Sequence, residues 1–343
     1  MAVDRRVSDQ SNRAMKTKSE GIQTIQKNLS KLGITKKYLE TVVLPDWWDD
    51  EILNTGSGVQ EYLIHISRNL GISIKELRSE SINIEEFTIP LQYKMLRNQK
   101  VDKFRIYKSL CLDVSEKLLS ISKPELKIPK SAEEVRKILL QSNSIQLDHL
   151  LDYLKECGIL VLPPFRLPSK SSAPQGMVFL SEDIPVISLG EKRKYPSYQT
   201  FTLLHELGHI VCGHLQKEPI WDFKIRKELE NQIEIDANRF AMEVLTGEPN
   251  FSVQLNAKQN PENFAESCKM EGKNRNINPE YLAINFAWSN ANHDYWSLAN
   301  AALKIMEKPN ALEILQHKFT NIINSLEISD SYNDYLKRIT SFE

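Results

Sequence analysis

The amino-acid sequence predicts a mostly helical α+β fold that contains one small sheet, and three observations support this prediction. Apolar residues recur at helical spacing over much of 21–120 and again after residue 255. Two short apolar runs, at 159–165 and 176–189, are bounded by turn residues in the way that is typical of strands. The apolar segment 198–213 is long enough to form a buried helix.

The composition is that of a soluble protein with more than one packed unit. The chain has 343 residues, of which 41% are hydrophobic and 26% are charged. Its net charge of −1 excludes a general attraction to polyanions, so that any contact with nucleic acid has to be local. The 4 cysteines lie far apart, and the N-terminus has no apolar signal segment. No apolar run is long enough to span a membrane. We therefore expect a cytoplasmic protein.

The first part of the chain is predicted to contain a polar, disordered tail and then short helices. Residues 1–20 lack periodicity, whereas 21–88 contain a helix–glycine–helix pattern in which Gly71 forms the turn and Ser73 the N-cap. Residues 89–129 are predicted to be a connector helix and a linker with two prolines. The helix is basic: over 94–108 it carries one acidic residue, Asp102, against Lys94, Arg97, Lys100, Lys103, Arg105 and Lys108.

The second part of the chain is predicted to be a mixed domain, 130–255, followed by a helical region, 256–343. The mixed domain starts with a Ser-x-x-Glu capping box at Ser131. Its strands at 176–189 flank a Ser-Glu-Asp turn and predict a hairpin, and a second helix after 198–213 ends at Gly247. The helical region carries no recognisable catalytic motif.

His205, Glu206 and His209 form the pattern His-Glu-x-x-His within the long apolar helix. Residues four apart share a face of a helix, so both imidazoles can reach one metal ion. Zinc accepts such ligands and lowers the pKa of a bound water to about 7, so that a neighbouring carboxylate can take its proton. The alternative is a buried helix whose histidines are hydrogen-bonded in the core.

A third ligand is needed for a catalytic zinc site, and Glu234 on the following helix is the main candidate. Ala237, Asn238 and Ala241 share its helical face, and the small alanines favour close packing against the first helix. His214, five residues after His209, projects about 140° away on an ideal helix and is interpreted as a structural or surface group.

Five further residues near these motifs have roles that the sequence leaves open. Glu230 is a weaker ligand candidate, and Asp236 is either a weak ligand or a support for a ligand histidine. Cys212 is interpreted as a small buried hydrophobic residue rather than as a redox-active thiol. Tyr195 and Tyr198 precede the helix and are candidates for stabilising an oxyanion.

The segments "FTLLHELGHIVCGH" and "EIDANRFAMEVL" together resemble the ImmA/IrrE metallopeptidases, and the resemblance covers about 130–255. It implies a zincin-like fold in which His205, His209 and Glu234 bind Zn²⁺ and Glu206 is the general base. It also implies hydrolysis of a bacterial regulatory protein, often a repressor. Such a substrate would bind by pairing with a sheet edge, which we expect to be one of the two strands within 176–189.

The N-terminal region resembles, more weakly, the Cro/repressor-type helix-turn-helix domains that are fused to such peptidases. The resemblance rests on "LIHISRNLGISIKEL" and "VLPDWWDDE". The centre of the region departs from it, because two tryptophans and an acidic run, Asp46, Asp49, Asp50 and Glu51, replace the expected recognition helix. Acidic residues oppose binding to phosphate, so that protein contacts are as plausible as DNA contacts.

The sequence therefore predicts a zinc-dependent endopeptidase that acts on a repressor-like protein in a stress, mobile-element or defence response. The alternatives are a toxin or phage-defence protease with a host target, a DNA-binding regulator with a zinc-sensing site, and a catalytically inactive scaffold. Three roles stay open for the C-terminal helices: capping the cleft, binding a partner, or association into a homo-oligomer.

Overall fold

The computed structural model describes residues 21–82, 101–215, 220–222, 232–256, 258–290 and 295–341. Contacts between Cα atoms divide the chain into two compact units that interleave along the sequence. Unit 1 comprises Met1–Val114, Phe165–Ala173 and Glu327–Glu343, and unit 2 comprises Ser115–Pro164 and Pro174–Leu326. Three sequence predictions lie outside the described residues: the tail 1–20, the start of the basic helix, and Glu230.

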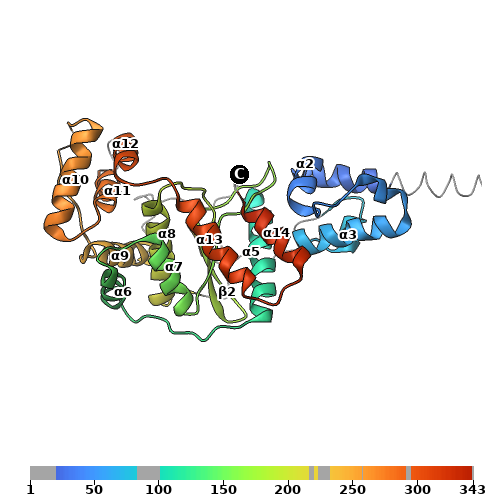
Figure 1. Cartoon of the computed structure of the whole chain (residues 1–343), viewed down its shortest axis with the longest axis horizontal. Helices are drawn as coiled ribbons and strands as arrows, with labels where there is room; N and C mark the ends of the chain where they lie inside the picture. The colour runs from blue at the N-terminus through green and yellow to red at the C-terminus, as the bar shows by residue number, and fades with distance from the viewer. Residues whose placement is uncertain are drawn as a thin grey trace, which may run out of the picture. The chain divides into compact units, whose positions relative to one another are not determined.

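The described part of unit 1 is helical (Figure 1). After a helix at 21–31, its elements are α2 (Lys36–Tyr38), a π-helical turn (Leu39–Val43), a 3-10 helix (Asp50–Asn54), α3 (Gly56–Leu70), α4 (Ile74–Leu77), the first two-thirds of α5 (Val101–Ile121) and α14 (Asp330–Thr340). Lys108 on α5 is buried, so this basic residue does not belong to an exposed face.

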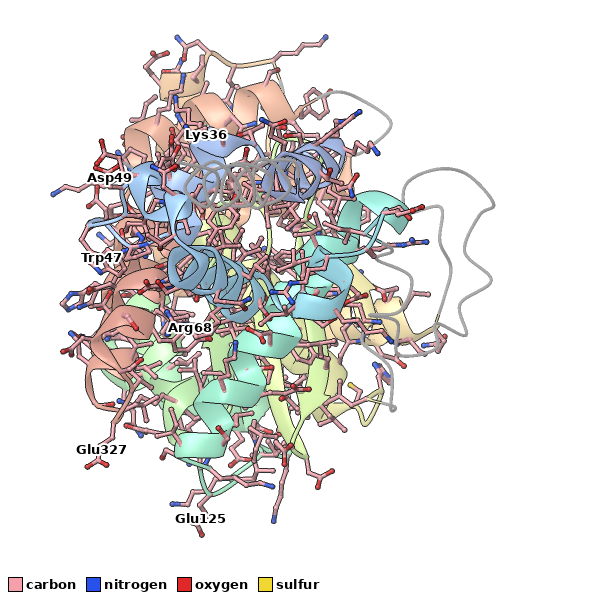
Figure 2. All side chains as sticks on the ribbon, turned by 90° about the vertical axis from the view of Figure 1, so that its right-hand side faces the viewer. Lys36, Trp47, Asp49, Arg68, Glu125 and Glu327 are labelled. Atoms are coloured by element: carbon pink, nitrogen blue, oxygen red, sulfur yellow. The ribbon has the colours of Figure 1, made fainter. Side chains whose placement is uncertain are left out.

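The predicted helix–glycine–helix pattern is confirmed in α3 and α4. Gly71 ends α3 with a φ of 68°, and the Ser73 side chain caps α4 in a capping box with Glu76. Between the first helices and α3 lie Trp47, which is 58% exposed, and Asp49, and Figure 2 shows both at the outer edge of the view. Whether this region binds DNA or protein stays a prediction.

Helix α14 is part of the core of unit 1, although it lies at the far end of the sequence. The buried hydroxyl of Tyr335 donates a hydrogen bond to the backbone carbonyl of Asn69. The side-chain amide of Asn69 in turn donates to the backbone carbonyl of Val43 at 2.6 Å. The backbone N–H of Arg166 donates to the carbonyl of Ile339 at 2.7 Å. Three separate stretches of chain therefore complete one packed unit. The segment boundaries expected from the sequence stay predictions, since compact units need not coincide with functional domains.

Unit 2 contains the sheet and most of the remaining helices. After the end of α5, its elements are α6 (Ala132–Leu139), a 3-10 turn (Leu140–Ser142), α7 (Leu147–Glu156), β1 (Leu160–Leu162), β2 (Gly176–Ser181), β3 (Ile184–Leu189), α8 (Pro196–Val211), β4 (Ile220–Asp222), α9 (Gln232–Thr246), α10 (Pro261–Arg275), α11 (Pro279–Ser289), α12 (Trp296–Met306) and α13 (Ala311–Asn324). No helix among the described residues is long and apolar enough to cross a membrane.

The described strands form one mixed sheet with the order β1-β3-β2-β4. The predicted hairpin is confirmed: β2 and β3 are antiparallel, and Ser181 pairs with Ile184 across a two-residue turn. Both turn residues, Glu182 and Asp183, have positive φ angles of 52° and 64°, as a type I′ turn requires. β1 pairs with β3 in parallel, and β4 pairs with β2 in antiparallel orientation.

The expectation that a substrate edge lies within 176–189 is wrong for β3, because β3 lies between β1 and β2. β2 is also paired on both sides from Gly176 to Val178, and within the described residues Phe179–Ser181 pair with β3. The outer strands of the described sheet are β1 and β4. The sequence did not indicate β4, because three residues are too few to show a periodicity.

Helices α10, α11 and α12 pack against one another at one end of unit 2 (Figure 1). Phe264 and Phe286 form the centre of this contact, with ring centroids 5.1 Å apart. Trp296 on α12 is partly buried and packs against the hydrophobic cluster that contains residues of α8 and α9. These helices therefore support the two helices that carry the predicted ligands.

Candidate metal centre

Helix α8 is enclosed by the protein along almost its whole length, since every residue from Ser197 to Ile210 is buried. A helix that is apolar on all sides belongs in the interior of a domain. Pro196 occupies its first turn, where a missing N–H costs nothing. Its N-terminal end is held by Glu307, which accepts hydrogen bonds from the backbone N–H of Ser197 at 3.2 Å and from the Ser197 hydroxyl.

This capping contact makes the stability of unit 2 dependent on pH. Burial raises the pKa of Glu307 from 4.5 to about 7. A raised carboxyl pKa stabilises the fold below pH 4.5, and this contribution is lost as the pH rises through about 7. We expect Glu307→Gln to unfold at the same temperature as wild type at pH 5 and at a higher temperature at pH 8. If the unfolding temperatures of Glu307→Gln and wild type differed by the same amount at both pH values, ionisation of Glu307 between pH 5 and pH 8 would be excluded.

Helices α8 and α9 cross closely, as the sequence predicted from the small residues of α9. An added Cβ on Gly208 would lie 3.0 Å from the Cα atom of Ala237, and Ala237 and Ala241 are fully buried. Glycine and alanine at the crossing let the two backbones approach. This brings the first turn of α9 beside the histidines of α8.

Three ligand atoms converge at this crossing. His205 Nε2 lies 3.2 Å from His209 Nε2 and 3.2 Å from Glu234 Oε2, and His209 Nε2 lies 3.6 Å from Glu234 Oε1. In a tetrahedral zinc site with bonds of about 2.0–2.1 Å, neighbouring ligand atoms lie about 3.3–3.4 Å apart. The spacing of the two imidazole nitrogens, and of each nitrogen from one oxygen of the Glu234 carboxylate, is close to this value. The donor set fits a metal ion.

The surroundings of His209 and Glu234 shift the pKa values of both groups toward the protonation states that metal binding needs. Burial, with the neighbouring His205, lowers the pKa of His209 to about 3, so its imidazole is neutral. Burial alone would raise the pKa of the Glu234 carboxyl, but the hydrogen bond with His205 and the nearby histidine charges hold it below its usual value. Imidazole nitrogens and a carboxylate are typical zinc ligands.

Glu206 is fully buried next to the first residue of β2. A Cβ added to Gly176 would lie 2.2 Å from Glu206 Oε1 and 2.9 Å from a methyl carbon of Thr202. Only glycine leaves room for the carboxylate at this position. Gly176 could not be recognised from the sequence, because the contact joins a strand to a helix through the tertiary fold.

Both ligand histidines have a partner on the nitrogen that faces away from the cluster. His205 Nδ1 lies 3.1 Å from Asn238 Oδ1, and His209 Nδ1 lies 3.1 Å from His214 Nδ1. Hydrogen bonds of this kind fix the ring orientation and leave Nε2 for the metal. Asn238 was recognised only as part of a motif, and the structure gives its contact.

The comparison with protein families agrees with this geometry. Residues 158–270 match Peptidase_M78, the IrrE N-terminal-like domain. The chain carries a Peptidase_M78 domain. The match includes the sheet, α8 and α9, and the predicted ImmA/IrrE resemblance is confirmed for this part of the chain, as is the zincin-like α+β fold flanked by helical regions. No curated protein and no solved structure matches the chain.

Two interpretations of residues near the M78 centre are wrong. Cys212 is exposed rather than buried, because α8 ends at Val211. His214 does not project away from the cluster, because the helix on which that projection was based has already ended. Tyr195 and Tyr198 are not brought to the ligands: Tyr195 is the N-cap of α8, and the Tyr198 hydroxyl donates to Asn300 at 3.0 Å.

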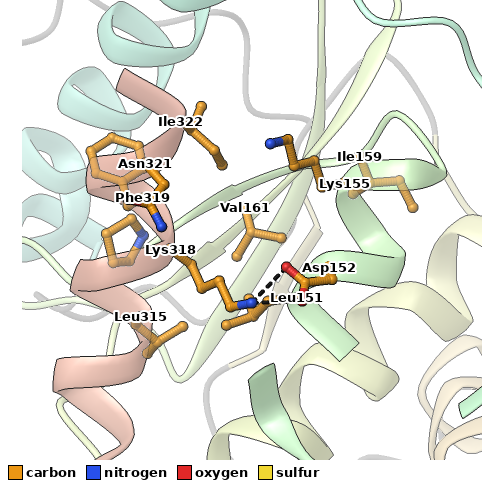
Figure 3. A pocket seen from close by; sticks show the side chains of 11 residues that line it. Leu151, Asp152, Lys155, Ile159, Val161, Leu315, Lys318, Phe319, Asn321 and Ile322 are labelled. Atoms are coloured by element: carbon orange, nitrogen blue, oxygen red, sulfur yellow. Dashed lines mark hydrogen bonds and ion pairs between the residues drawn. The ribbon is translucent and has the colours of Figure 1, made fainter. Parts of the chain in front are cut away.

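A separate pocket of about 110 Å³ lies in unit 2 between α7, β1 and α13 (Figure 3). Its floor is apolar, and at its rim Lys318 forms an ion pair with Asp152 at 2.6 Å. None of the residues that line this pocket belongs to the ligand cluster of the M78 domain. We assign it no part in the chemistry below.

Proposed function

We propose that this protein is a zinc-dependent endopeptidase in which His205, His209 and Glu234 hold Zn²⁺. One observation carries the proposal: the two imidazole nitrogens lie 3.2 Å apart, and each lies 3.2–3.6 Å from one oxygen of the Glu234 carboxylate, with Glu206 buried on the same helix as the histidines. Membership of a metallopeptidase family supports it. Zinc is favoured over harder cations because two of the three ligands are imidazoles.

Zinc in this site would lower the pKa of a water molecule to about 7 and polarise the carbonyl group of the scissile bond. Glu206 would accept the proton of that water and then deliver it to the nitrogen of the leaving amine. Burial of Glu206 against Gly176 holds the carboxylate in one place, so that no reorganisation is needed during the reaction.

The substrate would be an extended peptide segment bound along the sheet. β4 is the outer strand on the Gly176 side, and it pairs with β2 at Gly176, next to Glu206. A peptide that adds a strand there would bring its backbone to the ligand cluster. We propose a repressor-like regulatory protein as the substrate, on the basis of the ImmA/IrrE resemblance. A host protein cut by a toxin or defence enzyme would need the same chemistry.

The first experiment is the metal content of protein purified without added zinc. We expect about one zinc ion per chain in wild type and in Glu206→Gln, because Glu206 is not a ligand in this proposal. The metal-loaded Glu206→Gln form should bind substrate without cutting it. Incubated with extract of the source cells, it should retain a protein that wild type cleaves, and mass spectrometry of new N-termini would locate the cut.

Two outcomes would contradict the proposal. Wild type that holds no zinc even after reconstitution would exclude the metal site. Zinc-loaded wild type that produces no new N-termini relative to Glu206→Gln would exclude endopeptidase activity and favour a sensing role. In that case a salt-dependent gel shift with DNA would test the regulator alternative.

A further inference from the structure

A row of polar side chains leads away from the ligand cluster on the side of His209. His209 Nδ1 lies 3.1 Å from His214 Nδ1, His214 Nε2 lies 3.9 Å from Asp236 Oδ2, and Gln232 donates to Asp236 Oδ1 at 2.7 Å. We propose that His214, held by Asp236, is a positioning residue that orients His209 and sets its tautomer for metal binding. The proposal rests on the zinc site proposed above.

The end of α8 explains how His214 reaches this place. Gly213 has a φ of 71°, its N–H donates to the carbonyl of Ile210, and the N–H of His214 donates to the carbonyl of His209 at 2.9 Å. These two bonds define a Schellman motif, which reverses the chain after the last helical turn. His214 is thereby folded back over the turn that carries His209, and its side chain is only 11% exposed.

The contacts along the row determine where each proton lies. A metal ligand must keep the lone pair of His209 Nε2 free, so the ring proton is on Nδ1 and is donated to His214 Nδ1. The proton of neutral His214 is then on Nε2, which faces the Asp236 carboxylate. Every member of the row has one defined role, and the carboxylate at its end increases the basicity of His209 as a ligand.

The other ligand histidine has a different kind of support. His205 Nδ1 faces the amide oxygen of Asn238, a single neutral acceptor on α9. His209, by contrast, contacts a second imidazole that faces a carboxylate. The two imidazoles of the cluster are therefore not equivalent, and loss of the His214 contact should release His209 alone.

The test measures the zinc dissociation constant by competition with a chromophoric chelator. We expect His214→Ala to weaken zinc binding by about 10–100-fold, the usual effect of removing a partner of a ligand histidine. His214→Asn should recover most of this loss, because its amide oxygen can accept the proton of His209 Nδ1. Asp236→Ala should weaken binding less, and it should add nothing to His214→Ala, because Asp236 acts through His214.

A matched control is available in α7, which carries none of the ligand residues. There His149 Nε2 lies 3.8 Å from Asp148 Oδ2, a contact similar to that between His214 and Asp236. His149→Ala should leave the zinc constant unchanged. The melting temperature of each zinc-free variant separates loss of folding from loss of positioning. Gly213→Ala gives a second, independent variant: an added Cβ meets nothing within 4 Å, but the positive φ disfavours alanine, so the Schellman turn and the His214 contact should weaken.

The inference and the zinc site can fail separately. If wild type binds no zinc, the proposed function is wrong. If wild type binds zinc and the zinc dissociation constants of His214→Ala and His149→Ala agree within about twofold, the proposed zinc site is retained and the positioning role of His214 is wrong. Additive effects of His214→Ala and Asp236→Ala would also contradict it, since residues in one row must show coupling.

Discussion

Replacing Glu234 with alanine should weaken zinc binding by more than about 100-fold, since even the loss of a ligand's hydrogen-bond partner costs about 10–100-fold. Glu234 supplies the only carboxylate of the cluster and lies 3.2 Å and 3.6 Å from the two imidazoles. Without it, two neutral histidines remain on one helix. We expect the variant to lose its metal on dialysis and to lose peptidase activity at the same time.

The control for this experiment is Glu243→Ala on the same helix. Nine residues separate the two glutamates, so at about 100° per residue they lie on opposite faces of α9. Glu243→Ala should keep one zinc ion per chain. If Glu234→Ala kept zinc with the affinity of wild type, the ligand set would be wrong, and Asp236 would be the next residue to replace.

Gly176→Ala should lower peptidase activity by roughly 100-fold or more while zinc binding is kept, because misplacing a reacting group by about 1 Å can cost that much. The new methyl group would lie 2.2 Å from Glu206 Oε1, so the carboxylate has to move. The ligands lie on α8 and α9, and Gly176 is on neither helix. Measuring kcat and the zinc constant on the same preparation would separate the two effects.

Alanine substitutions at two other glycines serve as controls for Gly176→Ala. Gly21→Ala places its Cβ in open space and should leave both kcat and the zinc dissociation constant unchanged. Gly208→Ala would push against Ala237 and separate α8 from α9, so it should weaken zinc binding itself. A Gly176→Ala variant with full activity would show that Glu206 is not confined by β2, and that its carboxylate has more freedom than the packing indicates.

The cluster of His205, His209 and Glu234 could be predicted from the sequence because its members follow helical geometry. His205 and His209 are one turn apart, and Glu234 precedes two alanines that permit close packing, so local spacing was enough. His214 could not be placed by the same rule, because Gly213 ends the helix and reverses the chain. Gly176 could not be found at all, since its importance comes from a contact between elements distant in sequence.

The same distinction applies to the fold. The β2–β3 hairpin was predictable from its turn and from its apolar runs, whereas β4 was too short to show any pattern. Helix α14 has clear helical spacing, but the sequence did not indicate that it packs with the N-terminal helices. That arrangement depends on pairings such as Tyr335 with Asn69, which local periodicity does not encode.

The packing of α14 into unit 1 also bears on the order in which the chain folds during synthesis. Every described element of unit 2 is synthesised before α14, so the residues that match Peptidase_M78 can begin to fold first. Unit 1 has to wait for Tyr335 and Ile339, although its first helices are among the earliest to emerge. A nascent chain therefore holds an unfinished N-terminal unit throughout translation, which makes that unit the part most dependent on chaperones and most exposed to proteolysis.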